Sequence, residues 1–99
     1  MRLLGLDVGT TGVKAVVFDE SGATLGSAYR EVPVLTDATG RAEQDAEAVW
    51  GELKAVIRRA AAGARDIAAA GLSVQGDAII PMGRHLRAVG PATVYTLEP

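Results

Sequence analysis

A short polar turn near the start of the chain carries the residue types best suited to phosphate chemistry. The run Asp7-Val8-Gly9-Thr10-Thr11-Gly12 supplies one carboxylate, two hydroxyls and a row of unobstructed backbone N–H groups, and Lys14 follows closely. Such amides and hydroxyls suit phosphate oxygens, and a carboxylate suits the accompanying divalent cation. We therefore interpret the turn as a candidate phosphate and metal site. The alternative is a turn whose carboxylate bonds only to local amides.

Two apolar runs flank this turn and predict a β-hairpin. Residues 2–8 and 13–19 are nearly continuous in apolar side chains over the length of a strand, which is typical of buried strands. Gly9 and Gly12 suit the turn because glycine reaches backbone angles that are closed to residues with a Cβ atom. A longer and more polar run over residues 24–34 predicts a third antiparallel strand at the edge of the sheet.

One amphipathic helix is predicted after a loop over residues 36–41. Asp45 has the position of a helix N-cap, and apolar residues recur from there at three- and four-residue spacing up to Ala64. Trp50 lies on this apolar stripe, so we expect it to anchor the core.

A fourth buried strand is predicted over residues 67–75. Because it follows a helix, we expect it to lie parallel to the first strand and beside it. Gln75, Gly76 and Asp77 would then end at the same rim as the polar turn. Residues 78–89 suggest a further hairpin, and residues 91–97 another strand. The predicted fold class is α/β, with a mixed sheet of three antiparallel strands, a helix and a parallel fourth strand.

Composition narrows the classes of function. The 99 residues carry a net charge of -2 at pH 7 and no cysteine, so the basic footprint of a nucleic-acid-binding protein is missing. Any metal must be bound by oxygen, and His85 is interpreted as a turn residue. No apolar run approaches the roughly 18 residues of a membrane span, and no signal peptide is recognisable. We expect a cytoplasmic protein with neither nucleic acid nor membrane as partner.

Three segments together resemble the FGGY family of carbohydrate kinases. Residues 7–19 are similar to its first phosphate motif. Glu43-Gln44-Asp45, followed by Trp50, is similar to its Glu-Gln-Asp-Pro and tryptophan segment, and Gly71-Leu72-Ser73-Val74-Gln75 to its Gly-Leu-Ser-x-Gln strand. The resemblance implies the ribonuclease H-like fold of actin-like ATPases. The matching segments cover only the N-terminal part of kinases such as xylulokinases, gluconokinases and glycerol kinases. The resemblance therefore implies that residues 1–99 are the first part of an N-terminal domain, without the C-terminal domain.

The resemblance also implies roles for the polar turn. Members of the family transfer the γ-phosphate of ATP to a sugar or polyol hydroxyl. By match, Asp7 holds Mg²⁺ through water, and Gly9, Thr10 and Thr11 contact the β- and γ-phosphates. Lys14 either neutralises phosphate charge or projects into solvent. The family's catalytic base belongs to a later region, so residues 1–99 are expected to contain none.

The second polar cluster matches the sugar-recognition segment of the family. Gln75, Gly76 and Asp77 are the candidate substrate residues, with Asp77 accepting hydrogen bonds from substrate hydroxyls. The alternative for Asp77 is a turn former. Better-known branches have Met-His or Arg-Glu after the glutamine, so Gly76-Asp77 leaves the identity of the sugar open. Glu43 and Gln44 are interpreted as structural residues.

Two functions stay open on the sequence. The first is the N-terminal portion of an ATP-dependent sugar kinase that is inactive alone. The alternative is a non-catalytic module of the actin-like superfold that binds nucleotide or a partner. Both faces of the first two strands are apolar, yet the sequence supplies one long helix. One sheet face therefore lacks a cover, and we expect a dimer or a segment-swapped assembly through it.

Overall fold

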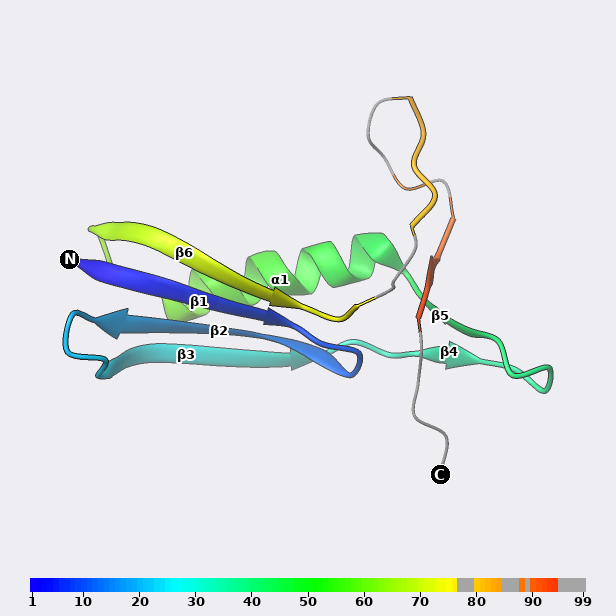
Figure 1. Ribbon diagram of the computed structural model, residues 1–99, viewed down its shortest axis with the longest axis horizontal. Coiled ribbons are helices and arrows are strands. Elements are labelled where there is room, and N and C mark those ends of the chain that lie inside the picture. The colour runs from blue at the N-terminus through cyan, green and yellow to red at the C-terminus, as the bar shows by residue number, and fades with distance from the viewer. Residues whose placement is uncertain (77–79, 85–87, 89, 95–99) are drawn as a thin grey trace.

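The computed structural model describes residues 1–76, 80–84, 88 and 90–94, which form two small sheets and one helix (Figure 1). The elements in chain order are β1 (Arg2–Val8), β2 (Gly12–Asp19), β3 (Thr24–Glu31), β4 (Leu35–Thr36), β5 (Ala42–Gln44), α1 (Ala46–Ala60), β6 (Ile67–Val74) and β7 (Ala92–Thr93).

The larger sheet has the strand order β3-β2-β1-β6. β1 and β2 pair antiparallel, with Arg2 opposite Asp19 and Val8 opposite Val13. β3 continues antiparallel on the outer side of β2, while β6 lies parallel to β1. The predicted hairpin, the edge strand and the parallel fourth strand are therefore confirmed.

Helix α1 begins at the cap that the sequence predicts. The Asp45 carboxylate accepts hydrogen bonds from the N–H groups of Glu47 and Ala48 at 3.0 and 3.3 Å, which satisfies donors that have no partner inside the helix. The helix ends at Ala60, earlier than the apolar stripe suggests, and the chain turns back through Gly63 at a φ of 82°.

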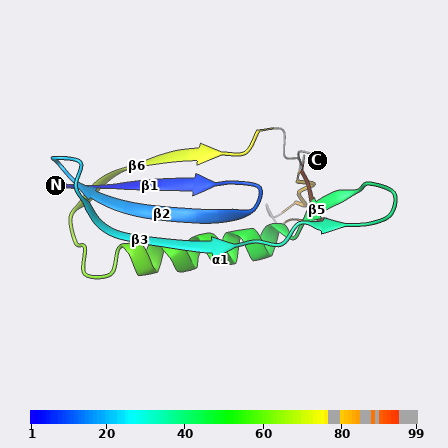
Figure 2. The same cartoon turned by 90° about the horizontal axis from the view of Figure 1, so that it is seen from below.

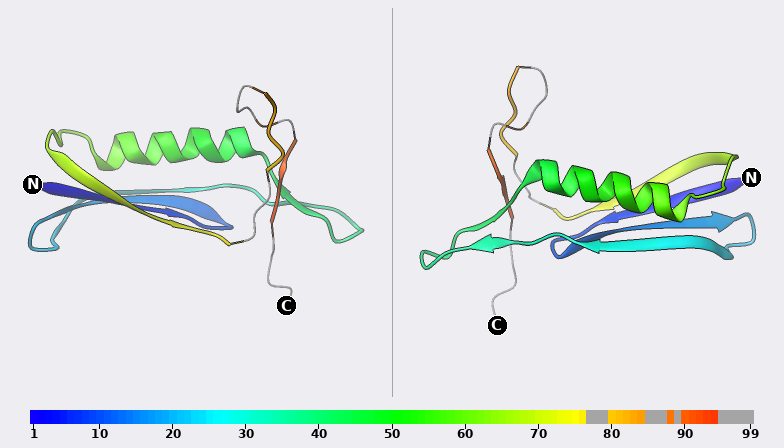
Figure 3. Two further views of the ribbon diagram at one scale, coloured as in Figure 1. Left: turned by 45° about the horizontal axis from the view of Figure 1, so that its top comes forward. Right: turned by 180° about the vertical axis from the view of Figure 1, so that it is seen from behind.

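The core lies between α1 and the two strands β2 and β3. Figures 2 and 3 show the helix running along one face of the sheet and leaving the other face bare. Val13, Ala15 and Val17 of β2 are buried against Val56 and Ala60 of the helix. The alternation along β2 explains this, because every second side chain points to the same face.

Trp50 does not anchor the core, contrary to the sequence prediction. Its side chain is 52% exposed, and the Lys54 ammonium lies 5.4 Å from the centre of its ring. Val49, Leu53 and Val56 face the sheet. Trp50 follows Val49 by one residue, which is about 100° around a helix, and this places it on the flank of the apolar stripe.

The prediction that β6 is buried is also wrong. Leu72 and Val74 are 65% and 59% exposed, because α1 packs on β2 and β3 and leaves the edge strand largely uncovered. On the opposite face Leu3 and Tyr29 are exposed as well. The expectation that one sheet face lacks a cover is thus met by the described residues, and the bare area extends around the β6 edge.

A second sheet, of order β4-β5-β7, was not predicted from the sequence. Its strands have two or three residues each, which is too short for any periodicity to emerge. The predicted third strand ends at Glu31, three residues before its expected end at Val34, although the Val32 N–H still donates to the Thr11 carbonyl at 3.0 Å. The small sheet joins the segment before the helix to β7.

The region after β6 is described only in part. Met82 forms an antiparallel bridge with Ala88, which agrees with the predicted hairpin, and β7 lies inside the predicted strand 91–97. Residues 77–79, 85–87, 89 and 95–99, and with them Asp77 and His85, lie outside the described residues. Among the described helices, none has the length and apolar character needed to cross a membrane.

Candidate functional site

The polar turn between β1 and β2 is closed by its own backbone. The Gly9 N–H donates to the Gly12 carbonyl at 2.9 Å. Neither glycine adopts a positive φ, so the predicted need for glycine backbone angles is wrong. At Gly12 the reason is space instead, because a Cβ atom would meet the Tyr29 hydroxyl and lie 2.6 Å from the Arg30 carbonyl oxygen. The turn is therefore held tightly against β3.

Two amides of this turn are available to a ligand. Within the described part of the chain, the N–H groups of Thr10 and Thr11 donate to no backbone carbonyl. Thr11 is exposed and Thr10 is half-buried. Adjacent free N–H groups in a turn form a concave donor set for an anion, which is the chemistry that the predicted phosphate site would need.

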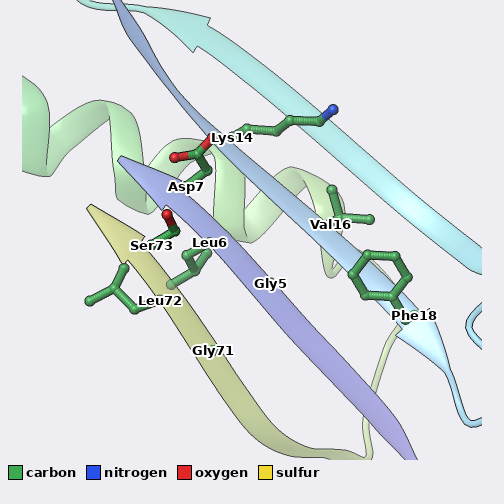
Figure 4. A pocket seen from close by; sticks show the side chains of 9 residues that line it. All are labelled: Gly5, Leu6, Asp7, Lys14, Val16, Phe18, Gly71, Leu72 and Ser73. Carbon is green, nitrogen blue, oxygen red and sulfur yellow. The ribbon is translucent and has the colours of Figure 1, made fainter. Parts of the chain in front are cut away.

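Asp7 lies at the end of a shallow groove on the helix-free face of the sheet (Figure 4). The groove has a volume of about 410 Å³ and follows from a pair of glycines, because Gly5 and Gly71 are register partners without side chains. Phe18 borders it at one end, 3.3 Å from where a Cβ atom of Gly5 would lie. The polar end carries the exposed Asp7 carboxylate beside Ser73.

Lys14 is the register partner of Asp7 on β2. Among the described residues no ion pair joins the two side chains. Figure 4 shows the Lys14 chain extending away from the Asp7 carboxylate. The ammonium is exposed, which is compatible with both sequence interpretations of Lys14, phosphate neutralisation and solvent exposure.

The residues present fit a magnesium ion that is shared with phosphate. Among the described residues there is no cluster of three or more His, Cys, Asp or Glu side chains, and Asp7 is the carboxylate beside the turn. Mg²⁺ is usually bound by one or two carboxylates together with waters and substrate phosphates. A single exposed carboxylate next to free amides has that chemistry.

Gln75 is joined to the phosphate turn by direct hydrogen bonds. The Thr10 hydroxyl donates to Gln75 Oε1 at 3.0 Å, and the Gln75 backbone N–H donates to the Val8 carbonyl at 2.8 Å. The predicted convergence of the two polar clusters is thus realised at Thr10 and Gln75. Gly76 follows as an exposed residue, and Asp77 lies outside the described residues.

Gln44 also belongs to this region, although the sequence assigned it no site role. It is 1% exposed, and its side-chain amide donates to the Thr10 carbonyl at 2.6 Å. Its Oε1 accepts from Gln75 Nε2 at 3.1 Å. In the sequence, Gln44 was marked by its place in the Glu-Gln-Asp motif, directly before the helix cap. Its contact with the turn depends on β5, which has no sequence signature.

The groups with shifted pKa values lie away from this site. Hydrogen bonding to Arg2 lowers the pKa of Asp66, and hydrogen bonds from Ser21 and the Ala23 amide lower that of Asp19. Both carboxyls lie at the far end of the sheet. Hydrogen bonds from Thr39 lower the pKa of Asp37 in the β4–β5 turn. These carboxylates are therefore structural.

Comparison with known proteins gives a consistent match over nearly the whole chain. Residues 2–97 match the model of the N-terminal domain of the FGGY family of carbohydrate kinases. A glycerol kinase from Acinetobacter baylyi is 38% identical over 98 residues, covering 94% of this chain and 20% of that kinase. A probable L-xylulose kinase from Haemophilus influenzae is 30% identical over 93 residues, covering 90% of this chain and 19% of that kinase.

A solved structure agrees with these sequence matches. The ligand-bound xylulose kinase from Lactobacillus acidophilus superposes with a TM-score of 0.84 at 26% identity, covering 93% of this chain and 19% of that one. The chain therefore spans about a fifth of the length of the relatives that it matches.

Proposed function

We propose that this chain, which belongs to the FGGY family of carbohydrate kinases, forms the opening part of the N-terminal domain of an ATP-dependent kinase. The reaction is transfer of the γ-phosphate of ATP to a hydroxyl of a sugar or polyol. Such a transfer depends on positioning and charge neutralisation more than on covalent chemistry by the protein. A carboxylate, free amides and hydroxyls are the groups that this reaction uses.

The polar turn is the proposed phosphate-binding element. The N–H groups of Thr10 and Thr11 would donate to the β- and γ-phosphate oxygens, and Gly9 keeps the backbone accessible. Asp7 would hold Mg²⁺ through water, and the ion would neutralise charge on the transferring phosphoryl group. Lys14 would add positive charge on the neighbouring strand.

The end of β6 is the proposed sugar-recognition element. Gln75, Gly76 and Asp77 are the candidate substrate residues. The relatives are named as kinases of glycerol, xylulose and gluconate, which supports a small polyhydroxylated acceptor. We assign no catalytic base to residues 1–99, because ATP, acceptor and base meet only when a second domain closes on this wall.

One observation supports the proposal more strongly than the others do. The Thr10 hydroxyl and the Gln75 amide, which the sequence assigned to two different ligands, lie 3.0 Å apart. A phosphate on the turn and an acceptor at the end of β6 would therefore be neighbours, as phosphoryl transfer requires.

Two experiments test the proposal at different levels. The reading frame that encodes residues 1–99 should continue into a second glycine-rich phosphate loop and an aspartate base. The purified 99-residue chain should show no acceptor phosphorylation and little ATP binding by calorimetry. Sugar phosphorylation by the chain alone, or a reading frame that ends at Pro99, would contradict the proposal.

A non-catalytic module is the second candidate, and the bare sheet face favours it. Leu3 and Tyr29 are exposed there, and such a surface suits a protein partner. This candidate would bind nucleotide or partner without turnover. A reading frame without the second phosphate loop would favour the non-catalytic module over the kinase. In either case we place the protein in the cytoplasm, where ATP is available.

A further inference from the structure

Three side chains close a ring of hydrogen bonds behind the phosphate turn. The Thr10 hydroxyl donates to Gln75 Oε1 at 3.0 Å, Gln75 Nε2 donates to Gln44 Oε1 at 3.1 Å, and Gln44 Nε2 donates to the Thr10 carbonyl at 2.6 Å. The members come from the turn after β1, from the end of β5 and from the residue that follows β6. The ring therefore ties together three segments that are far apart in the sequence.

The direction of each bond in the ring is fixed. Each glutamine accepts through its oxygen and donates through its nitrogen, so rotating either amide by 180° would place like groups against each other. Gln44 is 1% exposed, and no buried side-chain polar atom among the described residues lacks a partner. Thr10 and Gln75 are half-buried, and a network that is closed around one buried amide restrains its members toward one arrangement.

The ring also distinguishes the two threonines of the turn. The hydroxyl hydrogen of Thr10 is engaged by Gln75, so Thr10 presents its backbone N–H to a ligand. Thr11 is exposed, and its hydroxyl makes no hydrogen bond within the described residues. The donor hydroxyl for a phosphate is therefore that of Thr11.

We propose that Gln44 is a positioning residue that sets the phosphate-binding turn against the sugar-binding end of β6. This inference rests on the proposed kinase function. Gln44 lies behind the turn and acts through the Thr10 carbonyl and the Gln75 amide. Its loss frees both elements at once, which misplaces phosphate and acceptor relative to each other. Misplacement of reacting groups by about 1 Å can lower a rate by roughly 10²-fold.

The first test replaces Gln44 with methionine in the complete product of the reading frame. Methionine has similar length and volume but can neither donate nor accept a strong hydrogen bond. We expect kcat to fall by about tenfold to a hundredfold, with a smaller change in the KM for ATP. The matched control is Glu43→Gln, which alters the adjacent residue and its ion pair with Arg41 at 3.6 Å but leaves the ring intact. It should keep kcat within about twofold.

A second variant, Gln44→Glu, separates positioning from simple packing. When the introduced carboxyl group is protonated, its O–H can donate to the Thr10 carbonyl while its other oxygen accepts from Gln75, whereas the ionised form offers only acceptors. Burial raises the pKa of a carboxyl group in such a place. We therefore expect the ratio of variant to wild-type kcat to rise by roughly threefold or more as the pH falls from about 8 to about 6.

A stability control completes the test. Val56→Ala removes two methyl groups from the buried core and should lower the unfolding midpoint without changing kcat at 25 °C. If Gln44→Met lowers the unfolding midpoint in the same way and leaves kcat unchanged, the positioning role is wrong. A flat pH ratio for Gln44→Glu would overturn it as well. A wild-type product that phosphorylates no acceptor would instead refute the proposed function, so the two failures are distinguishable.

Discussion

Asp7 and Thr11 are the two side chains of the turn that face solvent. Asp7 ends the groove on the helix-free face, whereas the Thr10 hydroxyl is turned inward toward Gln75. The residues that motif matching treats as one phosphate-binding set therefore divide into those that can meet a ligand and those that hold the turn. Ligand-facing and supporting residues should give different kinetic phenotypes when they are replaced.

Asp7→Asn in the complete product tests the ligand-facing role. The amide keeps the shape of the carboxylate and removes the charge that would attract Mg²⁺. We expect kcat to fall by roughly 10² to 10³-fold, with the KM for the acceptor nearly unchanged. Asp66→Asn, at the far end of the sheet, is the control and should leave both constants unaltered. An Asp7→Asn enzyme with normal kcat at low magnesium would contradict the metal role.

Asp77→Asn tests the acceptor-facing role that the sequence motif predicts. We expect the KM for the acceptor to rise by about tenfold or more, because a carboxylate accepts stronger hydrogen bonds from hydroxyls than an amide does. The KM for ATP should change little. If Asp77 is only a turn former, neither KM will move, and any loss will appear in the unfolding midpoint.

At the scale of elements, the long periodic segments could be predicted and the short ones could not. β1 and β2 have seven and eight residues, and the stripe of α1 is continuous, so their types and pairing follow from the sequence. The pairing of β4 with β5 depends on the turn at Gly40, where φ is 85°. The role of Gln44 depends on β5, which explains why the sequence did not reveal it.

The sequence also failed to predict which apolar side chains are buried, and this failure has a geometric cause. Leu72 and Val74 lie on the same face as the core residues of β1 but beyond the reach of α1. Trp50 directly follows Val49, which faces the sheet, and therefore lies on the flank of the apolar stripe of α1. An apolar side chain makes burial favourable. Whether the side chain is buried depends on whether a helix or another strand packs over it.

Two glycine-to-alanine changes test the docking of α1 on β3. A Cβ atom at Gly26 would meet the Ala60 carbonyl oxygen, whereas at Gly51 it would meet nothing within 4 Å. We expect Gly26→Ala to lower the free energy of unfolding by about 1–3 kcal/mol. Gly51→Ala should raise it by about 1 kcal/mol, because alanine is the better helix former. Urea unfolding of both variants measures this, and equal effects of the two would contradict the close packing.

At the scale of the whole molecule, charged groups tie the chain start to the loop before β6. Arg2 hydrogen-bonds Asp66, and the Met1 amino group lies 2.9 Å from Glu20 and 3.4 Å from Asp66. Hydrogen bonding to Arg2 lowers the pKa of Asp66, and hydrogen bonding to Glu20 raises the pKa of the amino group from its ordinary value. All these groups are exposed, so salt should weaken the effect.

The pH dependence of stability follows from these directions. The contribution of Asp66 is present above its unfolded pKa, near ~4, and is lost as the pH falls through the lower folded value. The contribution of the amino group is present below about 8 and is lost as the pH rises through the higher folded value. In a carboxyl NMR titration, Arg2→Gln should raise the pKa of Asp66 toward its ordinary value, because the Met1 amino group still lowers it, and should leave the lowered pKa of Asp37 unchanged. An Asp66 midpoint that ignores this substitution would refute the pairing.

The uncovered sheet predicts association of the isolated chain. Leu3 and Tyr29 on one face, and Leu72 and Val74 at the β6 edge, expose apolar surface that favours burial against another surface. We expect sedimentation velocity to show a concentration-dependent dimer for residues 1–99. Leu3→Lys and Leu72→Lys identify the face involved, since only one of them should dissociate the dimer. A monomer at all concentrations would contradict this prediction.

The central claim is that the turn after β1 and the end of β6 form one wall of a site for phosphoryl transfer to a hydroxyl. The most direct test is acceptor-stimulated ADP formation by the complete product of the reading frame. Glycerol, xylulose and gluconate serve as acceptors, with Mg²⁺ and ATP present. We expect at least one acceptor to raise ADP formation by roughly tenfold or more, a modest demand beside enzymatic accelerations, with one phosphorylated acceptor formed per ADP. A folded product that releases ADP at the same rate with and without every acceptor would contradict the account.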